Sequence, residues 1–502
     1  MKAPDTTALS QEQQIALHKE VGRHVPAHFA KVFLNVELAE HQVGWIAFID
    51  NGKRVVLLAP RDHGKSFTVT YAYVLWKLAY NKNLRILIIS RTSAQAIKFL
   101  NQIREALQRY PLLISIFELA PDDSGNPWTR TMLYVKRTAL LKDPSIECVG
   151  LGGSITGGHF DLIICDDIVE AGDENSSTGM ATTLEWLKGT LTNLAEPNTR
   201  IIIVGTRKSY RDLYSVLAEE GIYAIRKEAA ILQYPSRWDY LRSENGIITG
   251  VQIDAEDGQV LWPEKWSIQD LLLKRAELGP IVFDRELQND PSGMKGNFLK
   301  LDWLHFVDEL PPDDLLRNIY IGCDPAISMK QSADQFAVAV VREYKSGYWY
   351  LSDVFLDRLE FPEQVTRLES LGTTFKPRKM FVESVAYQSA LSQKLIRDTR
   401  LPVFPVRAGA DKSTRFLSLS PFFENGKVRV VKGINPEFVK QWVSFPDGKH
   451  DDALDAVFFA LSELMADRNS QLLIARNSSQ PKKPETWADF SKYFRKTAEV
   501  KT

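Results

Sequence analysis

The sequence contains few cysteines, and none of them stands in a pattern that would pair it or bind a metal. Among 502 residues there are three, Cys148, Cys165 and Cys323. Their separations fit neither a disulfide framework nor a zinc site, and the last two lie in apolar, strand-like runs. We therefore expect three small core side chains in a reducing compartment.

Long apolar runs and a charge imbalance are also absent. No apolar run approaches the roughly 18 residues of a membrane span, and the polar amino-terminal stretch lacks a signal-peptide core. We expect no membrane contact and a cytoplasmic location. The formal net charge is -1, so any contact with nucleic acid has to come from local basic patches.

The composition, 44% hydrophobic and 25% charged, is that of a folded globular protein. Its length exceeds the roughly 250 to 300 residues that one core usually holds. Strands alternate with amphipathic helices, which predicts an α/β fold with parallel sheets. We predict a first domain over 1–290 with an amino-terminal helical segment and a lid or linker region from about 208, a linker over 291–315, a second domain over 316–466, and a flexible polar tail over 467–502.

The stretch RVVLLAPRDHGKS at 54–66 predicts a buried strand that enters a phosphate-binding loop. Gly64, Lys65 and Ser66 complete the end of the P-loop pattern, while Ala59 stands where its first glycine is expected. In such a loop backbone N–H groups surround the β-phosphate, the lysine contacts the β and γ oxygens, and the hydroxyl binds Mg²⁺. The helical pattern that follows favours an ATP site over an ordinary glycine turn at a helix end.

A second apolar strand, 160–165, delivers two acids to its carboxyl end, which is where open α/β sheets bind ligands. We assign Asp166 to the Mg²⁺ of the nucleotide and Asp167 to the attacking water, with Glu170 as a weaker candidate for the second role. The alternative is a pair of strand-end acids that cap helices or turns.

Two more polar residues flank these strands. Gln42 precedes the strand of the P-loop and could read the adenine edge, or it could be a solvated residue on a helix. Thr206 ends the strand RIIIVGTR at 200–207, where it could sense the γ-phosphate or simply mark a turn.

Acidic residues recur in the second domain at positions typical of the RNase H fold. Asp324 lies in its first strand and Glu383 in a later strand, RKMFVES. Converging acids repel one another unless cations hold them together, which predicts a nuclease with two Mg²⁺ or Mn²⁺ ions. We expect Asp324 to contact both ions and Glu383 one; satisfaction by backbone or basic partners is the alternative.

The remaining ligand is expected from the helix in GKHDDALDAVFFALSELM. Asp452 and Asp455 share one helical face with Asp451 at its edge. We rank Asp452 first, Asp455 second and Asp451 third. His450 fits a phosphate contact or a helix-end residue better than a ligand.

From about residue 35 to 465 the chain resembles the large terminase subunit of tailed bacteriophages. The resemblance rests on the joint order of LAPRDHGKS, FDLIICDDI, VGTR, LWPEKW, FDRELQNDP, CDPA, FVES and HDDALDA. Terminases commonly lack the first P-loop glycine and carry an arginine in the loop. The resemblance therefore implies a phosphate contact for Arg61 and a coupling role for Thr206. Many terminases have Glu where this chain has Asp167, which leaves the residue that orients the water open.

The resemblance implies a motor that hydrolyses ATP to move double-stranded DNA into procapsids, and a nuclease domain that cuts concatemeric DNA. It implies a homo-oligomeric ring on the portal protein, DNA delivery by a small terminase subunit, and a place in the host cytoplasm and transiently on the procapsid, not in the mature virion. Basic segments at 378–381 and 412–415 are candidate DNA contacts or solvated faces. The rival functions are a helicase or repair ATPase fused to a resolvase-like nuclease, and an inactive DNA-binding scaffold.

Overall fold

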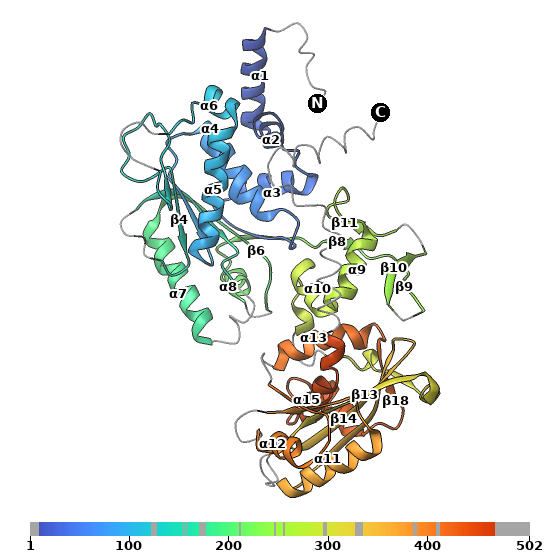
Figure 1. Cartoon of the computed structure of the whole chain (residues 1–502). Helices are drawn as coiled ribbons and strands as arrows, with labels where there is room; N and C mark the ends of the chain where they lie inside the picture. Colours follow the sequence, from blue (N-terminus) through green and yellow to red (C-terminus); the bar gives the residue numbers. More distant parts are fainter. Residues whose placement is uncertain are drawn as a thin grey trace. The chain divides into compact units, whose positions relative to one another are not determined.

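The structure is a computed structural model that describes residues 10–121, 128–153, 155, 158–169, 177–209, 212–244, 247–254, 257–294, 299–326, 335–384, 389–407 and 412–466. The chain divides into two compact units (Figure 1). Unit 1 comprises Met1–Ser243 and Ile248–Phe298, and unit 2 comprises Glu244–Ile247 and Leu299–Thr502. Within the described ranges no helix is both long and apolar enough to cross a bilayer.

Unit 1 consists, in chain order, of α1 (Gln11–His24), α2 (Pro26–Phe33), α3 (Glu40–Asn51), β1 (Arg54–Leu58), the π-helix η1 (Phe67–Tyr73), α4 (Val74–Tyr80), β2 (Ile86–Ser90), α5 (Ser93–Arg109), α6 (Pro111–Phe117), β3 (Met132–Leu133), β4 (Ile146–Gly150), β5 (Phe160–Asp166), α7 (Ser177–Leu194), β6 (Ala195–Gly205), α8 (Leu213–Glu220), β7 (Ala224–Lys227), β8 (Ile231–Gln233), β9 (Trp238–Arg242), β10 (Ile248–Ile253), β11 (Gln259–Val260), α9 (Ile268–Leu278), α10 (Pro280–Leu287) and η3 (Ser292–Met294).

The main sheet of unit 1 has the strand order β3-β4-β2-β5-β6-β1-β7, and its strands are parallel except for β3. Its central strands are apolar on both faces because helices cover both. Side chains of α2 to α6 form the core on one face, and side chains of α7 and α8 form it on the other. In this order β6 lies between β1 and β5, so the carboxyl ends of all three meet at one edge.

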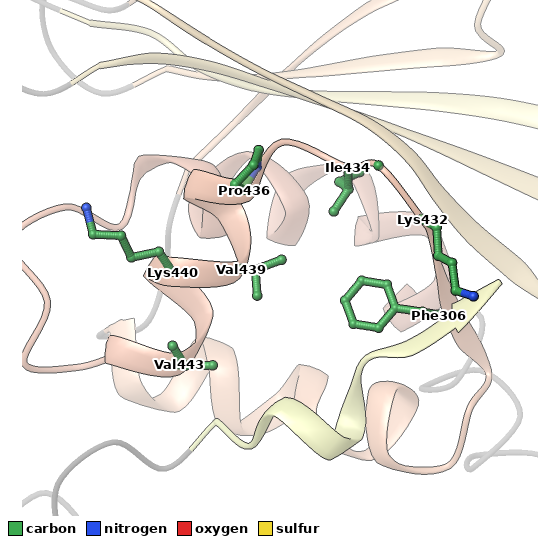
Figure 2. Close-up of a pocket in the computed structure, with 8 residues that line it drawn as sticks. Phe306, Lys432, Ile434, Pro436, Val439, Lys440 and Val443 are labelled. Carbon is green, nitrogen blue, oxygen red and sulfur yellow. The ribbon is translucent and has the colours of Figure 1, made fainter. Parts of the chain in front are cut away.

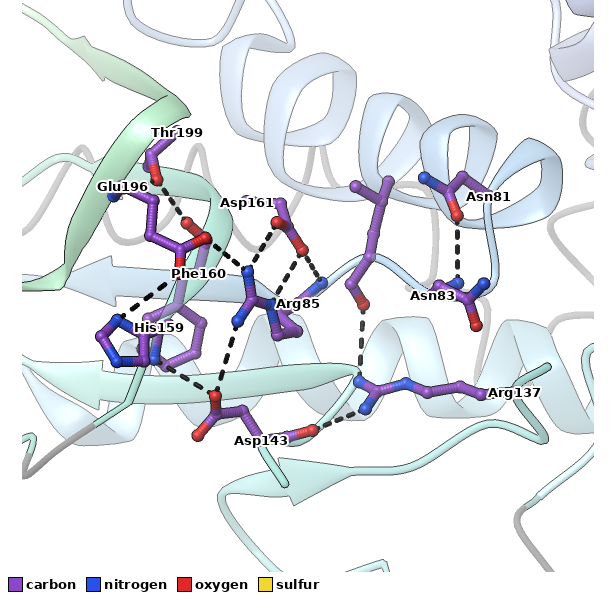
Figure 3. A network of polar contacts seen from close by, with 11 residues as sticks. Asn81, Asn83, Arg85, Arg137, Asp143, His159, Phe160, Asp161, Glu196 and Thr199 are labelled. Atoms are coloured by element: carbon purple, nitrogen blue, oxygen red, sulfur yellow. Dashed lines mark hydrogen bonds and ion pairs between the residues drawn. The ribbon is translucent and has the colours of Figure 1, made fainter. Parts of the chain in front are cut away.

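Arg85, which directly precedes β2, lies at the other end of these strands, where they begin (Figure 3). Its Nη2 lies 2.8 Å from Asp161 Oδ1 and 2.9 Å from Glu196 Oε2, and its Nη1 lies 3.8 Å from Asp143. Asp161 and Glu196 are the second residues of β5 and β6. One guanidinium therefore aligns the starts of the strands whose far ends carry the predicted ATP site.

The region from β8 to α10 forms a small subdomain of unit 1 with its own apolar core. β9 and β10 pair antiparallel. α10 covers the FDREL part of the FDRELQNDP stretch, and its apolar residues Phe283 and Leu287 are buried in this core.

Unit 2 consists of η4 (Leu301–Trp303), β12 (His305–Val307), η5 (Asp313–Leu315), β13 (Leu316–Asp324), β14 (Phe336–Tyr344), β15 (Trp349–Asp357), α11 (Phe361–Phe375), β16 (Lys379–Glu383), α12 (Ser389–Asp398), β17 (Val403–Val406), α13 (Lys412–Glu424), β18 (Val428–Val431), α14 (Pro436–Ser444) and α15 (Asp452–Ala460). Its sheet has the order β12-β18-β15-β14-β13-β16-β17. β12 lies within the predicted linker 291–315. It pairs parallel with β18 and forms the outermost strand on that side of the sheet.

The sheet of unit 2 is covered on both faces. β13, β14 and β15 are successively antiparallel, and β16 runs parallel to β13. α11 and α12 supply the core on one face, whereas α15 packs against β13 and β14 (Figure 1). At Gly322 in β13, an added Cβ would lie 2.1 Å from the Ala456 carbonyl oxygen and 2.2 Å from the Ala460 nitrogen of α15. Glycine is required there because the backbones nearly touch.

A cavity of about 510 Å³ lies between β12 and α14 (Figure 2). Its lining is mainly apolar, with Phe306, Val439 and Val443 on the walls and two lysines, Lys432 and Lys440, as the charged members. No acid lines it, so the cavity is distinct from the predicted carboxylate site.

The predicted burial of the cysteines is confirmed: Cys148, Cys165 and Cys323 are free and buried. The predicted tail 467–502 lies outside the described residues.

Candidate active sites

The predicted P-loop follows β1 and tolerates alanine at its first position. The Ala59 N–H donates to the Gly205 carbonyl at 3.0 Å, which extends the pairing of β1 with β6 by one residue. The left-handed positions of the loop are Asp62, with φ 63°, and Gly64, with φ 81°. A Cβ at Gly64 would also lie 2.4 Å from Gln42 Nε2. Glycine is therefore needed at position 64 for conformation and for space, and not at 59.

The structure brings together two predicted residues at the end of the P-loop, Lys65 and Ser66, and two at the end of β5, Asp166 and Asp167. Lys65 Nζ lies 2.7 Å from Asp167 Oδ2, and Ser66 Oγ donates to Asp166 Oδ1 at 2.9 Å. The other oxygen of Asp166 accepts a hydrogen bond from Thr70, a fully buried residue in η1 that the sequence analysis missed. π-helical turns often mark functional positions, but nothing local in FTVTYAY distinguishes this one from an α-helix.

The electrostatics of this cluster favour a cation. Burial and the neighbouring Asp167 raise the pKa of Asp166 to about 6, although Lys65, Thr70 and Ser66 oppose the shift. A buried carboxylate whose charge is incompletely compensated is stabilised by a divalent ion. The donor set of Ser66 and Asp166 therefore fits Mg²⁺.

Thr206 and Gln42 both contact the P-loop backbone. Thr206 is buried and its hydroxyl donates to the Ala59 carbonyl at 3.1 Å, which joins the end of β6 to the start of the loop. Gln42 is 3% exposed, so the solvated alternative is wrong. Its Oε1 accepts from the Ala39 N–H at 3.0 Å, and its Nε2 contacts the His63 carbonyl at 3.5 Å. The adenine and sensor roles stay predictions.

Arg61 has an exposed side chain, with Nη1 3.9 Å from Glu286 Oε2, while its backbone N–H donates to the Glu286 carbonyl at 2.9 Å. Glu286 in α10 also binds Lys208, at 2.8 Å. The sequence analysis missed Glu286 because more than 200 residues of chain separate it from the loop it supports. Glu170 lies outside the described residues.

The acids of unit 2 lie at the ends of adjacent elements. Cys323 pairs with Val382, so Asp324 and Glu383 follow side by side at the carboxyl ends of β13 and β16. Asp452 and Asp455, at the start of α15, are 3% and 4% exposed. The close approach of α15 to the sheet brings this helix start to the same edge.

The interactions of Asp324 show which acids are near it. Burial raises its pKa well above the usual value, with further contributions from Glu383, which also hydrogen-bonds it, and from Asp455 and Asp452. A carboxylate among three others suits a cation, so the donor chemistry fits a metal. In the described part of the chain, however, no group of three or more His, Cys, Asp or Glu side chains is arranged to hold an ion.

Basic side chains from α13 account for part of this arrangement. Arg415 Nη1 lies 2.7 Å from Asp455 Oδ1, and Lys412 Nζ lies 2.7 Å from Asp451 Oδ1. Asp451 is thus bound by Lys412 at the rim. His450 Nδ1 is 3.7 Å from Asp452 Oδ2.

The two basic segments contain both exposed and engaged side chains, and their contact with DNA stays a prediction. Arg415 is only 6% exposed and is engaged by an acid, so it does not form a solvated face. Lys379 pairs with Glu463 at 2.8 Å, while Arg378 beside it is exposed.

Residues 321–464, which include all five acids, match the family model of the terminase RNaseH-like domain. Over 265 residues the chain is 28% identical to the large terminase subunit of Enterobacteria phage T3. The chain is similar to large terminase subunits. The T3 match covers 50% of this chain and 43% of that relative, so it spans less than half of the T3 terminase.

Among solved structures, the large terminase of a thermophilic bacteriophage is 10% identical with a TM-score of 0.47, and the match covers 86% of this chain and 100% of that one. The HK97 large terminase is 14% identical with a TM-score of 0.34, and the match covers 88% and 99%. The predicted fold class is confirmed by the family match and the two sheets: a P-loop α/β unit precedes a terminase-type RNase H-like unit.

Proposed function

We propose that this chain is a viral DNA-packaging enzyme in which unit 1 hydrolyses ATP to move double-stranded DNA into procapsids and unit 2 cuts concatemeric DNA. One observation carries the ATPase half: Lys65, Ser66, Asp166 and Asp167 meet at the carboxyl edge of a parallel sheet. The terminase-type match over unit 2 supports the nuclease half and favours packaging over a helicase or repair role.

In the ATPase site Lys65 binds the β and γ oxygens of ATP, and Ser66 and Asp166 hold Mg²⁺. The metal, when bound, neutralises charge on the phosphates. In the structure Lys65 and Asp167 bind each other. When the phosphates of ATP bind Lys65, Asp167 is released from this pair and orients the attacking water. Arg61, whose exposed side chain can turn toward the phosphates, is the second cation, Thr206 relays the state of the loop to β6, and Gln42 reads adenine.

In the nuclease site Asp324, Glu383 and Asp452 would hold two divalent ions, either Mg²⁺ or Mn²⁺. Divalent ions bound there activate water and stabilise the leaving oxygen. The exposed Arg378 is a candidate contact for DNA phosphates.

The partners follow from the packaging role. We propose a homo-oligomeric ring on the portal protein of the procapsid, with DNA supplied by a small terminase subunit. The chain would act in the host cytoplasm and transiently on the procapsid, and would be absent from the mature virion.

The test combines purified protein, ATP, matching procapsids and DNA, and measures the DNA protected from added nuclease. Lys65→Ala should abolish ATP turnover and protection and leave metal-dependent cutting intact. Asp324→Asn should abolish metal-dependent cutting and leave ATP turnover intact. Lys31→Ala, which removes an exposed lysine of α2, is the matched control and should behave as the parent.

A folded Lys65→Ala protein that lost cutting in proportion to ATP turnover would contradict two separate sites. ATP-driven strand displacement by the parent, without protection of DNA by procapsids, would favour the helicase rival. A parent without turnover or cutting would favour a scaffold.

A further inference from the structure

Arg415 is a buried cation at the edge of the acidic cluster of unit 2. Its side chain is 6% exposed, and the Asp455 side chain that it binds is 5% exposed. Their closest atoms, Nη1 and Oδ1, are 2.7 Å apart. The guanidinium carbon also lies 5.4 Å from the centre of the Phe458 ring, one turn further along α15. The arginine is thus fixed by an acid and by an aromatic face of the same helix.

A second cation binds the same acid from the solvent side. Lys412 Nζ lies 3.3 Å from Asp455 Oδ2 and 2.7 Å from Asp451 Oδ1. Both oxygens of Asp455 therefore face basic groups of α13. Asp324 differs, because its hydrogen-bond partner is another acid, Glu383.

We propose that Arg415 is a positioning residue that serves as the permanent counter-ion of Asp455, which withdraws Asp455 from coordination and leaves Asp324, Glu383 and Asp452 as the metal ligands. The assignment of the metal ligands rests on the proposed nuclease function. The assignment of Arg415 as the counter-ion of Asp455 rests on their ion pair alone. The ligand assignment selects between the two acids of α15 that the sequence analysis ranks first and second.

The physical reason is the cost of a buried charge. A buried carboxylate needs a cation, and removing one member of a buried pair is far more damaging than removing both. Arg415 supplies that cation permanently, so α15 can pack on the sheet before any metal binds. A metal ion that used Asp455 would have to displace a buried guanidinium at 2.7 Å, and no such exchange is required of Asp324, which hydrogen-bonds another acid, Glu383.

The experiment measures two quantities on the full chain: the melting temperature of unit 2 in a chelator, and the Kd for Mn²⁺ by isothermal titration calorimetry. The variants are Arg415→Met, Asp455→Asn, their double variant and Asp452→Asn. Arg397→Met, which removes an exposed arginine of α12, is the control.

Without metal, Arg415→Met should melt at a lower temperature than the parent, and the double variant should recover most of the loss. Arg415→Lys should recover part of it. For Mn²⁺, Asp452→Asn should weaken binding by about tenfold or more, while Asp455→Asn should stay within about threefold of the parent.

An Asp455→Asn variant that loses Mn²⁺ affinity as much as Asp452→Asn would overturn the assignment of ligands. An unchanged melting temperature for Arg415→Met, or no recovery in the double variant, would overturn the counter-ion. A parent that binds no Mn²⁺ would instead refute the proposed metal site, and the melting temperatures would still decide the Arg415–Asp455 pair.

Discussion

His63, inside the P-loop, should make the stability of unit 1 fall steeply at mildly acidic pH. Its side chain is fully buried, and Nδ1 donates to the Arg61 carbonyl at 2.9 Å. Its Nε2 is buried and has no hydrogen-bond partner within the described residues. Protonation would place a charged N–H at that position without an acceptor.

Burial lowers the pKa of His63 from 6.5 to about 4, with smaller lowering effects from His41 and Lys265; the Arg61 carbonyl and Asp62 act in the opposite direction. Because the unfolded chain takes up the proton first, stability is fully present above pH 6.5 and is lost as the pH falls toward 4. The full shift corresponds to about 3 kcal/mol, and about 2 kcal/mol should already be lost between pH 7.5 and 5.

The assay is urea unfolding at a series of pH values, followed by tryptophan fluorescence. Trp262 and Trp266 are suitable reporters, since each ring centre lies 6.3 Å from that of His63. In His63→Asn the side-chain amide can still donate to the Arg61 carbonyl but does not titrate. This variant should lose about 2 kcal/mol less than the parent over the same pH interval.

His24 provides the matched control, because its side chain is 71% exposed. His24→Asn should leave the pH dependence of the parent unchanged. If His63→Asn kept the parental slope, or if His24→Asn removed it, His63 would not be the group that destabilises the acidic protein.

Three further changes test the packing around the two sites. Thr70→Val removes a buried donor to Asp166 and should cost about 1 to 3 kcal/mol of stability and weaken nucleotide binding, which Thr70→Ser should restore. Gly322→Ala forces apart two backbones and should cost about 1 to 3 kcal/mol by urea unfolding, whereas Gly189→Ala, with open space around its Cβ, should be neutral or stabilising. Glu286→Gln leaves the partly buried cations Lys208 and Arg285 without this acid and should cost about 3 kcal/mol and loosen the P-loop, measured as weaker nucleotide binding; parental stability in this variant would contradict the role given to α10.

The parts of the fold that depend on neighbouring residues were predictable. An apolar run before Gly64 and a helical pattern after it define a P-loop locally, and acids at strand ends define the two sites. The order of strands is a different kind of information. Nothing in the residues of β6 states that it inserts between β1 and β5, yet this insertion places Thr206 on the Ala59 carbonyl.

The remaining differences come from contacts between distant segments. Gln42 has the sequence of a surface residue and becomes buried because the P-loop backbone passes over it. Arg415 lies in a run that reads as a solvated basic face, and it is buried because α13 packs beside α15. The exposure of a polar residue in an amphipathic helix is predicted from the pattern of its own helix, whereas the residue that buries or binds it belongs to another element.

The two sites share one solution to the cost of buried acids. Each groups several carboxylates, and in each the chain's own cation binds one of them, Lys65 at Asp167 and Arg415 at Asp455. Asp166 and Asp324 both have raised pKa values because of burial and acidic neighbours. Burial also raises the pKa of Asp455, to about 6, although Arg415 and Lys412 act in the opposite direction. Asp324 and Asp455 therefore differ in their partners: Asp324 hydrogen-bonds another acid, whereas both oxygens of Asp455 already face cations. In each cluster the internal cation compensates part of the buried acidic charge within the folded chain, and a divalent ion at the proposed metal sites would supply the rest.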